Sequence, residues 1–166
     1  MRRMLGLVAL VGVIGFGALQ LVPYGRNHTN PPVTAEPAWA SQATRDLAAA
    51  ACFDCHSNET TWPWYTNIAP VSWLTQRHVD EGREKLNFST WGAGEQETEE
   101  IVRMIREGEM PTADYLLMHP EARLDAAQTQ TLVDGFTQMF GAGESGEGGD
   151  GGEQGEEHEG GDGDDD

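Results

Sequence analysis

Two cysteines and one histidine lie close together in the first third of the chain. Cys52 and Cys55 are the only cysteines among the 166 residues, and His56 follows the second one directly. The segment Cys52-Phe53-Asp54-Cys55-His56 is a C-x-x-C-H motif, which is typical of c-type haem attachment. Two thiols at this spacing can each add to a vinyl group of one porphyrin, and the adjacent imidazole can bind the iron. The motif therefore predicts covalent haem c, with His56 as the proximal iron ligand.

Three other roles are open to a pair of cysteines at this spacing. A redox-active C-x-x-C is expected in a thioredoxin-like βαβ setting, whereas the sequence around Cys52 indicates helix and loop. A structural disulfide can form outside the cytosol. A zinc site needs a second pair of ligands at suitable spacing, which the sequence lacks. The complete motif favours haem over all three.

The sixth iron ligand is predicted to be Met110. A methionine in this position raises the reduction potential and suits electron transfer. Met110 follows Gly108, where a helix is expected to stop, and precedes Pro111, which favours an extended loop. His78 is the alternative distal ligand, and the remaining candidates are Met104, Met118, Met139 and His119. Met104 lies on the apolar face of a predicted helix, where a methionine most often fills the core.

Aromatic residues are concentrated in the part of the chain that contains the motif. The five tryptophans are at positions 39, 62, 64, 73 and 91. Large flat side chains can shield a porphyrin from water. We expect Trp62, Trp64, Tyr65 and Trp73 to wall the haem, although ordinary core packing is compatible with the same composition.

The amino-terminal segment predicts a membrane helix. Arg2 and Arg3 precede an almost entirely apolar run, Met4 to Val22, which as a helix is about 28 Å long and close to the hydrocarbon thickness of about 30 Å. The arginines are expected to stay on the cytoplasmic side. Cleavage as a signal peptide near Gly15-Phe16-Gly17 is the competing interpretation. The length favours an uncleaved anchor, and both interpretations place the following domain on the periplasmic or extracytoplasmic side.

The chain divides into four segments by composition. Residues 1–22 form the anchor or signal peptide, and residues 23–40 form an extended tether because they contain four prolines. Residues 41–140 form the haem-binding domain. Residues 141–166 contain 11 glycines and 11 acidic residues but no lysine or arginine, so this tail is expected to be disordered.

The pattern of apolar residues in the domain predicts helices and no sheet. Ser41 is expected to cap a first helix that runs to about Cys52. Further helices are expected from Pro70 to Leu86, from 95 to 107, and from Asp125, where Gln128 completes a capping box. The fold class is therefore all-α, a small helical domain.

The charge of the chain limits its partners. The formal net charge is −18, and residues 23–140 contain 17 acidic and 8 basic residues. No segment is basic, which argues against nucleic-acid binding. An acidic surface favours a redox partner protein with a basic docking face.

Blocks of residues spread along the chain resemble the bacterial haem-binding domain family, whose members are small, membrane-anchored, cytochrome c-like proteins. The blocks are Asn30-Pro31-Pro32, residues 52–60, Trp62-Pro63-Trp64-Tyr65, Ile68-Ala69-Pro70, Ser72-Trp73-Leu74, His78-Val79, Glu81-Gly82-Arg83, Asn87-Phe88-Ser89, Trp91, Gly108-Glu109-Met110-Pro111, Tyr115 and His119-Pro120. The resemblance covers about Pro23 to Phe140 and leaves the tail outside. It implies haem on Cys52 and Cys55, proximal His56 and, by similarity to class I cytochromes c, distal Met110.

These features favour a one-electron carrier over an enzyme. No Ser/His/Asp pattern and no phosphate-binding loop are visible in the sequence. One alternative is a haem-based sensor or ligand-binding domain with a weak sixth ligand. The other is a small peroxidase-like enzyme, for which His78 or His119 would serve in acid–base catalysis.

Overall fold

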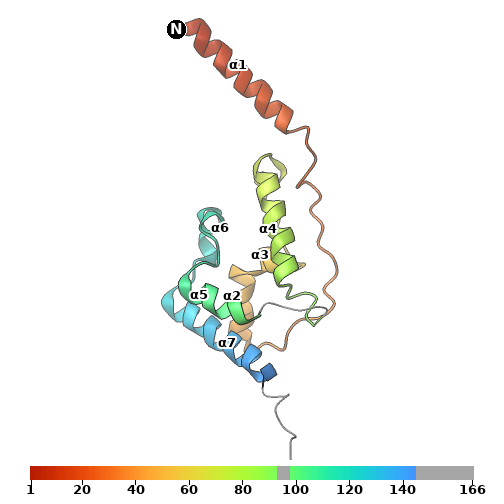
Figure 1. Ribbon diagram of the computed structural model, residues 1–166, viewed down its shortest axis with the longest axis vertical. Helices are drawn as coiled ribbons and strands as arrows, with labels where there is room; N and C mark the ends of the chain where they lie inside the picture. Colours follow the sequence, from red (N-terminus) through yellow and green to blue (C-terminus); the bar gives the residue numbers. More distant parts are fainter. Residues whose placement is uncertain (93–97, 145–166) are drawn as a thin grey trace, which may run out of the picture.

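The computed structural model describes residues 1–92 and 98–144. In this part of the chain the structure is all-helical, which confirms the predicted fold class, and the only strand-like feature is an isolated bridge between Ala35 and Thr90. The helices are α1 (Arg2–Leu19), α2 (Gln42–Ala51), α3 (Phe53–His56), η1 (Trp64–Asn67), α4 (Val71–Lys85), α5 (Thr98–Glu107), α6 (Ala113–Met118), η2 (Pro120–Ala122) and α7 (Ala126–Glu144) (Figure 1). The predicted helix start at 95 and the tail beyond Glu144 lie outside the described residues.

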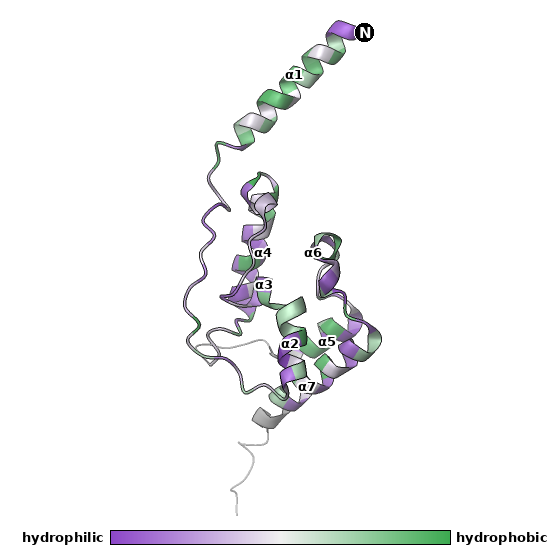
Figure 2. Ribbon diagram, turned by 180° about the vertical axis from the view of Figure 1, so that it is seen from behind, coloured by the Kyte–Doolittle hydropathy of each residue, from purple (hydrophilic) through white to green (hydrophobic). Residues whose placement is uncertain are grey.

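Helix α1 projects from the rest of the molecule (Figure 1). None of its residues is buried, and its surface is mostly apolar (Figure 2). It is the one helix in the described part of the chain that is long and apolar enough to cross a membrane. The helix ends at Leu19 and is capped by Gln20, three residues before the predicted end at Val22.

The proline-rich segment after α1 is extended, as expected, but it is bound to the domain along its length. The backbone N–H groups of Thr34 and Ala35 donate to the carbonyl of Ser89, and Trp91 N–H donates to the carbonyl of Ala35. Asn30 Nδ2 donates to the Thr60 carbonyl at 2.9 Å. These contacts make the segment part of the folded unit rather than a free tether.

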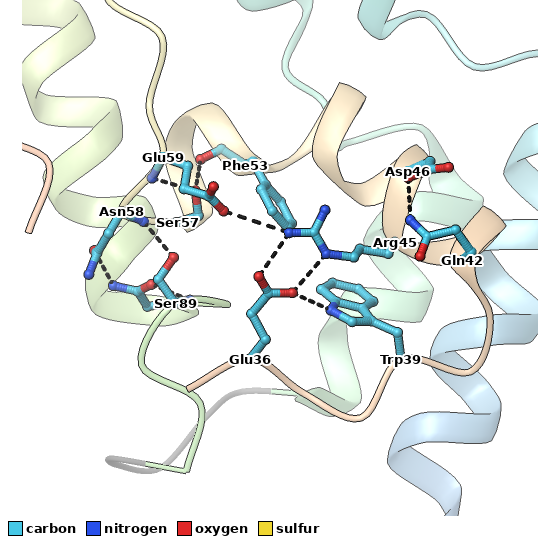
Figure 3. A network of polar contacts seen from close by, with 11 residues as sticks. Glu36, Trp39, Gln42, Arg45, Asp46, Phe53, Ser57, Asn58, Glu59 and Ser89 are labelled. Atoms are coloured by element: carbon cyan, nitrogen blue, oxygen red, sulfur yellow. Dashed lines mark hydrogen bonds and ion pairs between the residues drawn. The ribbon is translucent and has the colours of Figure 1, made fainter. Parts of the chain in front are cut away.

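A polar network fixes the end of this segment to α2 (Figure 3). The Arg45 guanidinium donates to both carboxylate oxygens of Glu36 at 2.8 Å, and Trp39 Nε1 donates to Glu36 as well. Arg45 also lies over the ring of Phe53, with the guanidinium carbon 5.4 Å from the ring centroid. Because Phe53 is inside the cysteine motif, the network links the extended segment to the turn that carries the thiols.

The helix ends follow the predicted capping residues. Ser41 Oγ accepts a hydrogen bond from Thr44 N–H at 3.0 Å. Asp125 Oδ1 accepts from Gln128 N–H, and Gln128 Oε1 accepts from Asp125 N–H, each at 2.9 Å, which confirms the capping box. Helix α5 is followed by Gly108 with a φ of +70°, a left-handed conformation that glycine adopts at little cost.

The core lies where α7 packs against α2 and α5. Phe88, Leu132 and Phe136 are almost completely buried there, and Trp39 and Trp91 pack against them. The short helices α3, η1, α6 and η2 were not expected from the sequence. They are too short to show a helical period in the apolar pattern.

Candidate haem site

A cavity of about 610 Å³ separates the α3–α4 part of the domain from α5 and α6. This volume is in the range of about 300–1,000 Å³ that is common for cofactor sites. Cys52, Cys55 and His56 line one part of it, and Met104 and Met110 line another. Apolar wall residues are Ala51, Leu86, Phe88, Ile101, Ile105 and Phe136. The cavity thus combines an apolar wall with Cys52, Cys55 and His56 of the C-x-x-C-H motif.

His56 is held in one orientation by backbone carbonyls. Its Nδ1 lies 2.9 Å from the carbonyl oxygen of Gly82 and 3.2 Å from that of Leu86. Because a carbonyl oxygen only accepts, Nδ1 carries the hydrogen and Nε2 keeps its lone pair. Burial lowers the pKa of His56, although the two carbonyl contacts oppose this shift. The result is a neutral, oriented imidazole with one nitrogen able to bind a metal, the arrangement usual for a histidine ligand.

Cys52 and Cys55 are free thiols, and their burial favours the neutral form. They lie one turn apart at the junction of α2 and α3, and no disulfide joins them. Burial raises the pKa of Cys52 to about 12 and that of Cys55 to about 11. Reactive redox cysteines have lowered pKa values because the thiolate is the nucleophile. The pair therefore lacks the electrostatic setting of a thioredoxin-like C-x-x-C.

Helix α4 approaches the motif backbone to backbone at Gly82. A Cβ atom added to Gly82 would lie 2.5 Å from the carbonyl oxygen of Cys55. Any other residue here would force α4 away from α3 and disturb the carbonyl that holds His56. In the sequence Gly82 is part of the block Glu81-Gly82-Arg83, but its packing role was not predicted, although a glycine inside a helical pattern is a known signal of close packing.

Arg83, the next residue of α4, holds the loop after the motif. Its Nε donates to the Ser57 carbonyl at 2.8 Å, and one terminal nitrogen donates to Thr60 Oγ1 and Asn30 Oδ1, each at 3.0 Å. One guanidinium thus connects α4, the loop after His56 and the extended segment. No spacing in the sequence indicates this role.

A second contact ties the motif to α6. Tyr115 OH donates to Asp54 Oδ2 at 2.8 Å, and both residues line the cavity. Asp54 Oδ1 accepts from Thr61 N–H at 2.7 Å, so the carboxylate is bound on both oxygens. Burial and the nearby carboxylate raise the pKa of Tyr115, which keeps the phenol protonated as a donor. Sequence analysis missed this pair because its members are 61 residues apart.

The candidates for the sixth ligand fall into two groups. Met110 and His78 line the cavity, and so does Met104, which was expected to be core filler. His78 Nδ1 lies 3.8 Å from Asp114 Oδ2 on α6. Met118, Met139 and His119 are not among the residues that line the cavity. Met118 is exposed, Met139 packs against the core, and His119 Nε2 is 2.9 Å from Tyr65 OH.

The aromatic residues that were expected to wall the haem lie outside the cavity. Trp62, Trp64, Tyr65 and Trp73 are all absent from the cavity lining. Trp62 stacks on His28 with ring centroids 4.4 Å apart, and Trp64 is exposed. The aromatic residues that do line it are Phe88, Phe136 and Tyr115, beside the aliphatic Ala51, Leu86, Ile101 and Ile105. Composition showed that aromatic residues are abundant, but it could not show which ones the fold turns inward.

A comparison with protein-family models shows which family the chain belongs to. The model of the haem-binding domain matches residues 14–138, which is most of the chain. The chain belongs to the haem-binding domain family. This confirms the resemblance noted in the sequence, and haem is the cofactor of this haem-binding domain. The match includes the end of α1 and stops before the acidic tail. Searches of curated proteins and of solved structures returned no significant match.

Proposed function

We propose that this haem-binding domain is a c-type cytochrome that carries single electrons outside the cytoplasmic membrane. The observation that carries the proposal is the placement of Cys52, Cys55 and His56 together on the wall of one largely apolar cavity. The oriented His56 imidazole and the reduced thiols fit haem c. Bound iron would supply a one-electron ferric/ferrous couple.

The thiols and the imidazole have distinct roles in this proposal. Cys52 and Cys55 would hold the haem through thioethers: each S–H would add across one vinyl double bond, with sulfur on one carbon and hydrogen on the other. This addition consumes no oxidant or reductant. The Gly82 and Leu86 carbonyls keep His56 Nε2 unprotonated and directed for iron binding. The apolar wall excludes water, which limits the reorganisation that accompanies a change of iron charge.

Met110 is the proposed sixth ligand, and His78 is the alternative. Met110 is on the loop between α5 and α6, where its N–H donates to the Met104 carbonyl at 3.3 Å. A neutral thioether favours ferrous iron and therefore raises the reduction potential of the haem. A raised potential suits an electron carrier. His78 Nδ1 lies 3.8 Å from Asp114 Oδ2, and this contact leaves Nε2 able to bind a metal, so His78 stays the alternative ligand. An iron whose sixth position is filled by a protein ligand has no site for a small molecule or a peroxide. This distinguishes an electron carrier from a ligand sensor or a peroxidase.

The proposed location is the outer face of the cytoplasmic membrane, with α1 as a single-pass anchor. The length and apolar surface of α1 support this location, and Arg2 and Arg3 lie in its first turn, as expected for a cytoplasmic end. The proposed partner is a redox protein with a basic docking face, because residues 23–140 contain 17 acidic and 8 basic residues.

The decisive experiment tests covalent attachment. The full chain, produced with a c-type haem maturation system, is denatured and extracted with acidic acetone. We expect the haem to stay with the polypeptide and to be lost when Cys52 and Cys55 are both replaced by alanine. Met118→Ala, a change at an exposed position, is the control and should keep the haem. Release of the pigment from the unchanged protein would show that the haem is not covalent.

A further inference from the structure

One end of the domain exposes large apolar side chains that the core does not use. On η1, Trp64 is 76% exposed, and at the start of α4, Val71 and Leu74 are 41% and 46% exposed. Val71 and Leu74 are three residues apart on a helix, so they share a face. Single exposed apolar residues need no explanation. Three of them on adjacent elements, including a tryptophan, form a surface that calls for a partner.

The end of α1 is fixed to this same surface by one side chain. Gln20 Nε2 donates to the Ala69 carbonyl at 2.9 Å, and Gln20 Oε1 accepts from Ala69 N–H at 3.0 Å. The two hydrogen bonds use both polar atoms of the amide and set its direction as well as its position. Ala69 directly precedes Pro70, the cap of α4. The one strongly polar residue of the apolar segment is therefore a connector between α1 and the domain.

The residues after Gln20 continue along the same end of the domain. Gly25 has a φ of +76° and packs so tightly on the Ser72 backbone that a Cβ atom would collide with it. His28 Nε2 lies 3.2 Å from the carbonyl oxygens of both Gly25 and Thr66. In Figures 1 and 2 the loop before α4 lies directly beside the end of α1. The connection is therefore a structured one, with no flexible link at the helix end.

We propose that this end of the domain, with Trp64, Val71 and Leu74, rests in the interface of the bilayer that α1 crosses. The inference rests on the membrane anchoring proposed above. A helix end fixed to η1 and α4 brings their exposed side chains to the level where α1 leaves the hydrocarbon. Tryptophan is enriched at that level because its ring is apolar and its N–H is polar. The bilayer is therefore the occupant that covers this surface.

Charge argues for an apolar contact with lipid rather than an electrostatic one. Residues 23–140 have 17 acidic and 8 basic residues, so anionic headgroups would repel the domain.

The surface also extends toward α6, because Tyr65 OH is 2.9 Å from His119 Nε2. Leu117 and Met118, directly before His119, are 74% and 54% exposed. Both sides of the cavity would then be held at a fixed orientation to the membrane.

The test is depth measurement with a spin label on the full-length protein in phosphatidylcholine vesicles. A nitroxide is attached to Leu74→Cys and, as a matched control, to Gln138→Cys, an exposed position on α7. Collisions with oxygen, which concentrates in lipid, are compared with collisions with a water-soluble nickel chelate. We expect the oxygen-to-nickel ratio to be several-fold higher at position 74 than at position 138.

Three outcomes separate this inference from the proposals on which it rests. Equal ratios in protein that remains in the vesicle pellet would overturn the membrane contact while anchoring stands. Protein that does not pellet would overturn both. Labelling of three cysteines instead of one would show that Cys52 and Cys55 hold no haem, and the ratio at position 74 would still decide the contact. Gln20→Leu keeps an apolar helix but removes both bonds to Ala69, so it should lower the ratio at position 74 without releasing the protein.

Discussion

His56 has only one ring nitrogen free to bind a metal, because the other donates to the carbonyls of Gly82 and Leu86. The orientation of this imidazole, the proposed proximal ligand, is thus set by backbone atoms, which a side-chain substitution can affect only by moving α4. The distal side differs, since Met104, Met110 and His78 all line the cavity. The choice of sixth ligand depends on side chains alone, so substitutions can test it directly.

Met110→Ala should open the sixth position. The ferric spectrum should move toward high spin or toward a replacement ligand such as His78, and ferrous protein should begin to bind carbon monoxide. The reduction potential should fall, because a thioether favours ferrous iron. Met110→His should stay low-spin at a lower potential. Absorption spectra and a redox titration measure these changes.

Met104→Ala and Met118→Ala are the matched controls for this test. Met104 lines the cavity from α5, so its loss should cost about 2–5 kcal/mol of unfolding free energy if the side chain is enclosed once haem is bound. Met118 is exposed and should change little. A change of spin state with Met104→Ala alone would move the assignment to Met104. If no methionine substitution affects the spectrum, His78 becomes the sixth ligand and the high potential is lost.

The chemistry of single residues was predictable from sequence only where it depends on local spacing. Cys52, Cys55 and His56 are within five consecutive positions, and the structure places all three on one cavity. Trp62 and Trp64 were expected on the wall because they follow the motif closely, yet the fold directs them elsewhere. Tyr115 and Arg83 act through contacts with residues distant in the sequence, which no local pattern indicates.

At the scale of helices, the packing of α4 on α3 depends on Gly82. Gly82→Ala should destabilise the protein, because the added Cβ would lie 2.5 Å from the Cys55 carbonyl oxygen. Overpacking of this kind costs about 1–3 kcal/mol, which outweighs the gain of roughly 1 kcal/mol from replacing glycine with alanine in a helix. Thermal unfolding measures the loss, and a perturbed ferric spectrum should report a displaced His56.

Asp80→Ala on the exposed side of the same helix is the control for Gly82→Ala. Asp80 accepts one hydrogen bond from Gln76, an i,i+4 contact on the surface. Its loss should change the unfolding free energy by no more than about 0.5 kcal/mol. Equal stabilities of the two variants would mean that α4 can move away from α3 without cost, and that the close contact does not position the motif.

Helix ends were predictable where capping chemistry is local. Ser41, Gly108 and the pair Asp125 and Gln128 each act within a few residues, and the structure has them in the expected roles. The extended segment was recognised from its prolines, but its docking along the domain was not. That docking depends on Ser89 and Arg45, whose positions are set by tertiary packing.

At the scale of the whole molecule, acidic residues line the cavity in addition to giving the chain its net negative charge. Asp54, Glu81, Glu84 and Glu100 line the cavity, against one lysine, Lys85. A negative local potential attracts cations and repels anions over a distance set by the Debye length. The field at the site should therefore control how fast charged redox reagents and partners reach it.

Electron transfer from the reduced full-length protein should depend on salt in opposite directions for oppositely charged oxidants. The rate with cationic tris(phenanthroline)cobalt(III) should fall as ionic strength rises from 0.01 M to 0.15 M, because the Debye length shrinks from about 30 Å to about 8 Å. The rate with anionic ferricyanide should rise over the same range. Stopped-flow absorption at the haem bands measures both.

Removal of residues 145–166 should leave the haem spectrum unchanged and reduce both slopes only in part, because the carboxylates that line the cavity remain. Rates that do not respond to salt would mean that electrons leave through a surface outside this field, and the expectation of a basic docking partner would be wrong.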